Sequence, residues 1–154
     1  MPRPRLIVLA LAIASALTVA ACGGDADEKN AYVDDVNNVT STLNSGLTEI
    51  STEAATVGSP EQAAGIFSDF AAQLDTAAAQ IEDISPPDDV AGLHYQLVDE
   101  ITTLSAAATG AADEIGAGGP AAVAGVATGF IGEANRLSAE VDTTISEINR
   151  QLQD

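Results

Sequence analysis

The feature that most constrains this fold is an apolar stripe that recurs at steps of three or four residues in four successive segments. The segments span residues 32–57, 63–84, 90–115 and 123–152. Side chains three and four positions apart share one face of an α-helix, whereas a half-buried strand shows simple alternation. The pattern therefore predicts four amphipathic helices and no strands. The large apolar members of the first stripe are Tyr32, Val36, Val39, Leu43, Leu47 and Ile50.

Glycine and proline separate the four segments. Ser59, Pro60 and Gln62 have the spacing of a helix start, with a capping side chain, a proline at the first helical position and a capping-box glutamine. The run at 85–87, "SPP", ends the second segment, and "GAGGP" at 116–120 ends the third. Short connections favour antiparallel neighbours. The expected fold is all-α, an up-down-up-down antiparallel four-helix bundle over residues 31–154.

Residues 115–132 carry no charge, and Gly125 and Gly129 have the small-xxx-small spacing that lets helices approach closely. Close helix packing is the expected use of these glycines, with a membrane-inserted hairpin as the alternative. Because glycine in a helix interior costs up to about 1 kcal/mol relative to alanine, this end of the bundle is expected to be the softer one.

The N-terminus has the pattern of a secretory signal. Arg3 and Arg5 precede an uncharged, mostly apolar run at 6–21, and small residues lead to the single cysteine, Cys22. The run is short for a membrane span, which needs about 20 apolar residues. We expect a signal peptide over 1–21, followed at 22–30 by a short polar tether.

The end of this run, Val19-Ala20-Ala21-Cys22, resembles the lipobox of bacterial lipoproteins. The resemblance implies that Cys22 receives a diacylglyceryl group and becomes the acylated N-terminus of the mature protein. Two or more acyl chains anchor a protein stably to a membrane, whereas one does not. The expected location is the extracytoplasmic side of the cell membrane, with the polypeptide held outside the bilayer.

The mature part is strongly acidic. All 23 carboxylate side chains follow Cys22, against the three cations Lys29, Arg136 and Arg150, for a net charge of −20. Nucleic acid binding requires a basic surface and is therefore disfavoured. The simplest interpretation of this negative charge is that the carboxylates lie on solvated helix faces. The alternative is a surface that binds cations with low affinity.

Residues with catalytic or metal-binding chemistry are scarce. His94 is the single histidine and borders the third stripe, where we expect a boundary residue that packs its ring and hydrogen-bonds outward. The sequence contains no Glu-x-x-His pair for a metal bundle, and its paired carboxylates are sequential neighbours that point apart on a helix. No enzyme activity, metal or cofactor is expected, apart from the covalent lipid.

One further stretch, Ile81 to Ile101, resembles a pattern in uncharacterised exported helical proteins of actinobacteria, in which Pro-Pro opens a helix and a histidine follows one to two turns later. The resemblance covers 21 residues and supports the helix boundary; it implies no activity.

These observations predict a lipid-anchored, non-catalytic bundle that binds or supports another component of the cell envelope. Two alternatives stay open. One is a low-affinity cation-binding surface lipoprotein. The other is a carrier with a small-ligand pocket between helices, in which His94 and Tyr95 would be the polar contacts.

Overall fold

The computed structural model describes residues 26–54 and 57–153, and gives backbone alone at 26, 44, 46–51, 53 and 54. The described part is all-helical and without strands, and four long helices pack against one another. The predicted helical class is thereby confirmed. The signal segment and Cys22 lie outside the described residues. The elements are α1 (Ala26–Ala54), α2 (Pro60–Glu82), the 3₁₀ turn η1 (Asp88–Val90), α3 (Ala91–Gly118), the 3₁₀ turn η2 (Gly119–Ala121) and α4 (Val123–Gln153).

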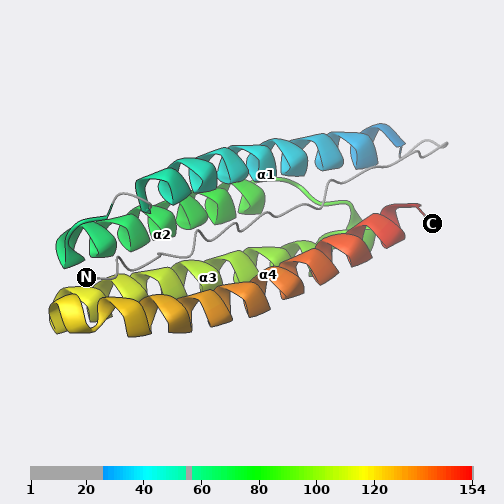
Figure 1. Ribbon diagram of the computed structural model, residues 1–154. Coiled ribbons are helices and arrows are strands. Elements are labelled where there is room, and N and C mark those ends of the chain that lie inside the picture. The colour runs from blue at the N-terminus through cyan, green and yellow to red at the C-terminus, as the bar shows by residue number, and fades with distance from the viewer. Residues whose placement is uncertain (1–25, 55–56, 154) are drawn as a thin grey trace.

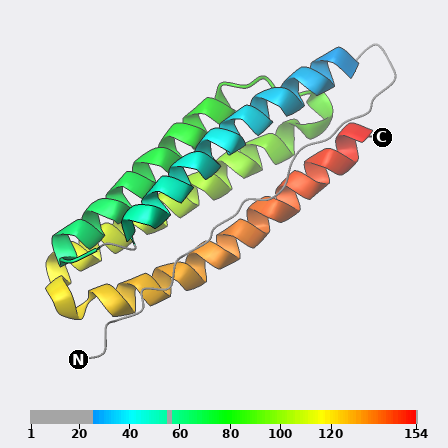
Figure 2. The ribbon, with the colours of Figure 1, turned by 45° about the horizontal axis from the view of Figure 1, so that its top comes forward.

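The helices lie side by side as long rods (Figures 1 and 2). α2 packs against both α1 and α3, and α4 packs chiefly against α3. The two inner helices therefore carry most of the bundle's contacts. α3 is 28 residues long, which at 1.5 Å per residue makes a rod of about 40 Å.

The core follows the predicted stripes. Phe130 of α4 lies edge-on to Phe67 and Phe70 of α2, with ring centroids 5.0 and 5.8 Å apart, an arrangement that aromatic quadrupoles favour. Leu47 and Ile50 lie among the side chains that the structure does not describe. The large buried apolar side chains among the described residues are Tyr32, Val33, Val36, Leu43, Phe70, Leu74, Ile81, Val90, Leu97, Ile101, Leu104, Ile115, Phe130, Leu137, Val141, Ile145, Ile148 and Leu152.

α1 begins at Ala26, so residues 26–30 are helical although the sequence placed them in the tether. Lys29 connects this first turn to the rest of the bundle. Its Nζ lies 3.5 Å from the carbonyl oxygen of Leu152 in the last turn of α4, and 3.5 Å from Asp89 of η1. A cation is favoured at a helix C-terminus, where the last carbonyls have no intrahelical partner. The first turn also carries Asp27 and Glu28, and negative charge is favoured at a helix N-terminus.

The start of α2 has the predicted capping residues. The Ser59 hydroxyl accepts a hydrogen bond from the backbone N–H of Gln62, and Pro60 occupies the first turn. The Gln62 side chain accepts from the N–H of Gly58 at 2.8 Å. A capping box would direct this side chain to the N–H of Ser59, so the reciprocal bond is displaced by one residue.

The turn between α3 and α4 depends on two adjacent glycines. Gly119 has φ +61° and ψ −153°, a region that is almost restricted to glycine. A Cβ added to Gly118 would lie 2.5 Å from the Cβ of Ala122. The predicted break at 116–120 is therefore found at 118–119, where the backbone requires it.

Gly125 and Gly129 do not serve the predicted close helix contact. A Cβ added at either position would meet no atom within 4 Å. The face of α4 that packs inward carries Phe130, Ala134 and Leu137 instead, and the glycines are exposed beside it. Among the described residues, no helix is long and apolar enough to cross a membrane.

Candidate functional site

A buried polar pair lies near the start of α1. The Tyr32 hydroxyl and Nδ1 of His94 are 3.3 Å apart, and both side chains are almost fully buried. Their rings are tilted against each other, with centroids 5.8 Å apart. The pair joins α1 to α3. Among the described residues, Nε2 of His94 is buried with no hydrogen-bond partner.

Burial perturbs both groups in the direction of the neutral form. Desolvation raises the pKa of Tyr32 to about 12. Desolvation also lowers the pKa of His94, and the negative charge of Glu82 opposes this effect in part. A neutral His94 can accept a hydrogen bond from the Tyr32 hydroxyl at Nδ1. In that tautomer the proton of the imidazole ring lies on Nε2.

The structure corrects the expectation for His94. The side chain is 0% exposed, so it is a core residue and not a boundary residue. The signal was present in the sequence, because Ile101, Ala108 and Ile115 follow His94 at intervals of seven. Tyr95 is 59% exposed and touches the edge of the His94 ring from outside. Neither residue lines either of the two grooves described below.

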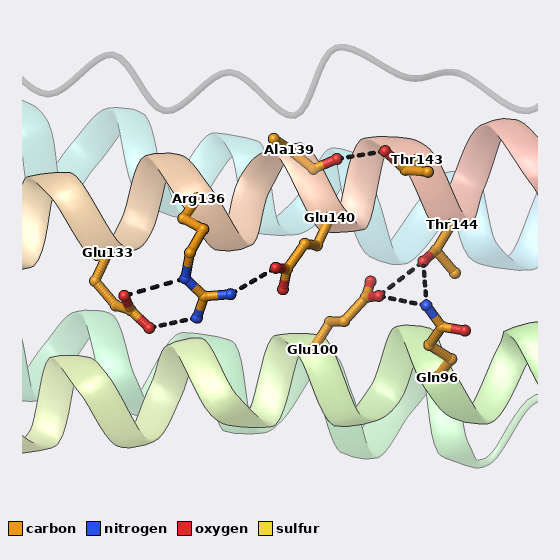
Figure 3. A network of polar contacts seen from close by, with 8 residues as sticks. All are labelled: Gln96, Glu100, Glu133, Arg136, Ala139, Glu140, Thr143 and Thr144. Atoms are coloured by element: carbon orange, nitrogen blue, oxygen red, sulfur yellow. Dashed lines mark hydrogen bonds and ion pairs between the residues drawn. The ribbon is translucent and has the colours of Figure 1, made fainter.

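A second polar cluster lies along the seam between α3 and α4 (Figure 3). Oε1 of the buried Glu100 accepts hydrogen bonds from Gln96 and from the hydroxyl of Thr144, both at 2.8 Å. Gln96 also reaches the Thr144 oxygen at 3.1 Å. Oε2 of Glu100 is buried and has no partner among the described residues. The apolar stripes did not indicate this cluster, although Thr144 lies seven residues after Leu137 in the fourth stripe.

Farther along the same seam, Arg136 of α4 bridges two carboxylates on its own helix, Glu133 and Glu140 (Figure 3). Hydrogen bonds from Arg136 lower the pKa of Glu133, so this carboxylate stays ionised at neutral pH. All three groups are substantially exposed. Exposed pairs of this kind contribute at most about 1 kcal/mol to stability, but they fix the directions of the side chains.

The seam opens into a groove of about 640 Å³ at the end nearest Gly119. Phe130, Val126 and several alanines give it an apolar lining, and the glycines leave helix backbone open to the surface. The charged residues in the lining, Glu114 of α3 and Glu133 of α4, are both acidic. The lining residues are Ala107, Gly110, Ala111, Glu114, Ala121, Ala122, Gly125, Val126, Gly129, Phe130 and Glu133.

A smaller groove of about 310 Å³ lies between α1 and α2, lined by Val39, Leu43, Ala77 and four uncharged polar residues. Neither groove contains a histidine or a cysteine. Within the described residues, no group of three or more His, Cys, Asp or Glu side chains is placed to hold a metal ion. The α3–α4 groove is the larger of the two and carries charge, which makes it the candidate binding site. The predicted lipidation site, Cys22, lies outside the described residues.

Comparison of the chain with protein-family models, with curated proteins and with solved structures gave no match.

Proposed function

We propose that the protein is a lipoprotein, anchored through Cys22 to the extracytoplasmic face of the cell membrane, whose helical bundle binds another component of the envelope. The bundle is proposed to have the up-down-up-down order that its short connections favour. It is proposed to act without a catalytic step, since its single histidine is fully buried and its single cysteine is assigned to the lipid.

The observation that carries the binding proposal is the α3–α4 groove. Apolar side chains and open helix backbone line it, and it is about twice the volume of the groove between α1 and α2. Surface concavities with an apolar floor and a few polar groups at the rim are typical of binding sites. The groove lies about 25 Å along α3 from His94, at the end of α3 away from the start of α1. A partner in the envelope space would reach it without entering the bilayer.

Only residues 23–25 separate Cys22 from the first residue of α1. Cys22 and Ala26 are four residue steps apart, which span at most about 14 Å, so an anchor on Cys22 holds the α1 end of the bundle close to the membrane. The Cys22→Ala variant tests the anchor. We expect it to leave the membrane fraction or to remain unprocessed, and membrane retention equal to the wild type would contradict the lipid assignment.

Site-specific photocrosslinking tests the binding role. A photoreactive residue replaces Gly129 in the groove or Gly65 on the exposed face of α2; both positions have space for a side chain. In the lipidated protein within its own envelope, we expect a discrete adduct from position 129 and none from position 65. Equal labelling from both positions, or none from either, would remove the groove as a binding site.

A further inference from the structure

The chemistry of the α3–α4 groove indicates which class of partner it takes. Its apolar lining requires an apolar face. Its charged lining residues, Glu114 and Glu133, are contributed by facing helices, and Glu133 is also paired with Arg136 of its own helix. The mature chain adds a net charge of −20 around them. A positively charged rim on the partner would be attracted both locally and at long range.

We propose that the groove takes a basic amphipathic helix contributed by another protein of the envelope. This inference rests on the binding function proposed above and specifies its partner. The groove extends from Ala121 of η2 along α4 to Glu133, which corresponds to about 18 Å of helix, or three turns. A docking segment of about 12 to 14 residues fits that length. Its apolar face lies over Phe130 and Val126, and its lysine or arginine side chains reach Glu114 and, beside the Arg136 guanidinium, Glu133.

The open glycines support this mode of docking. Gly110, Gly125 and Gly129 all line the groove, and each has free space where a Cβ would stand. An incoming helix can approach the backbone closely at such positions.

The negative charge of the chain and of the groove disfavours two other occupants. A second copy of this chain brings another net charge of −20, and an anionic lipid headgroup is repelled by the two carboxylates.

The test uses synthetic peptides and the mature lipoprotein in phosphatidylcholine nanodiscs, with empty nanodiscs as the blank. The probe is a fluorescent 14-residue helix of leucine and lysine with one apolar face. Two controls are the same composition in scrambled order and the same pattern with glutamate in place of lysine. We expect the amphipathic lysine peptide to bind with an affinity at least about tenfold higher than either control.

Variants then locate the binding. Gly129→Leu fills the groove and is expected to weaken binding about tenfold or more. Gly132→Leu, on the same helix and also open, does not line the groove and is expected to leave the affinity within about twofold. If Gly129→Leu fails to fold by circular dichroism, Gly129→Ala replaces it, with a smaller loss in the same direction.

A charge-matched pair separates docking from diffuse attraction. E114Q/E133Q is expected to weaken binding about fivefold, and D69N/D75N, which removes two exposed charges from α2, less than twofold. Equal effects of the two pairs would show that the peptide binds the general charge, and would overturn the proposal. Concentration-dependent dimers that Gly129→Leu abolishes would identify a second copy as the occupant and overturn it as well. A crosslink at position 129 that the lysine peptide fails to displace would leave the binding function in place and refute this partner class.

Discussion

Replacement of glycine by alanine should have opposite effects at different places in the Gly119 end of the bundle. Gly129 and Gly132 lie within α4, and a Cβ at either position meets no atom within 4 Å. Alanine is favoured over glycine in a helix interior by about 0.8–1 kcal/mol, partly because it restricts the unfolded chain. Neither substitution adds a clash, so each should stabilise the protein by about 0.5–1 kcal/mol.

The double variant G129A/G132A should therefore gain about 1–2 kcal/mol. For a domain of this size, 1 kcal/mol raises the thermal midpoint by about 4 °C, so the expected increase is roughly 4–8 °C. Gly119→Ala should do the reverse. Its φ of +61° is strained for alanine, and the expected loss is about 1–3 kcal/mol.

Thermal unfolding followed by circular dichroism at 222 nm measures both effects at constant pH and protein concentration. An unchanged or lower midpoint of G129A/G132A would refute this prediction, because it would mean that position 129 or 132 lacks the free space for a Cβ that the structure shows. It is also refuted if Gly119→Ala is neutral. The pair of single variants adds a functional readout, since Gly129→Ala narrows the groove and Gly132→Ala does not.

Three further predictions follow from the buried polar contacts and the helix cap. Because burial lowers the pKa of His94, the folded chain binds fewer protons than the unfolded chain below the usual pKa of 6.5. The contribution of His94 to stability is therefore full above that pH and falls on acidification by up to about 1.4 kcal/mol per pH unit. Urea unfolding measures it as the difference in unfolding free energy between the wild type and the reference variant Y32F/H94L. A free-energy difference that stays constant from pH 8 to 5 would contradict this prediction. Thr144→Val removes a donor from the buried Glu100 carboxylate and should cost about 1–3 kcal/mol, whereas Thr144→Ser, which keeps the hydroxyl, should cost less in the same assay. Ser59→Ala removes the α2 cap and should cost about 1 kcal/mol, and Ser59→Asp should restore most of it; equal stability of all three chains would show that the cap contributes nothing.

By the same argument, the glycines that line the groove make the protein less stable than alanine at these positions would. Three glycines line it although alanine would fit at each, and a chain selected for stability alone would lose them. Partner binding that survives Gly132→Ala but is lost in Gly129→Ala would connect the lower stability of the groove glycines to binding.

The amino-acid sequence by itself determined the helices. The three-and-four spacing of the apolar residues, the Ser59–Pro60 start and the glycine break at 116–120 are local signals, so the ends of α2 and α4 and most core positions were predicted closely. The start of α1 was not, because its first turn lies outside the apolar stripe; Lys29 in this turn contacts Leu152, 123 residues away in the chain.

Tertiary structure decided what each helix face meets. Periodicity states which side of a helix is apolar, but it does not state which residue lies opposite. The partners of His94 and Glu100 are Tyr32 and Thr144, which lie 62 and 44 residues away in the chain. In the same way, the glycines at 125 and 129 have the spacing of a close contact, and they line an open groove because the inward face of α4 lies one position farther round, at Phe130.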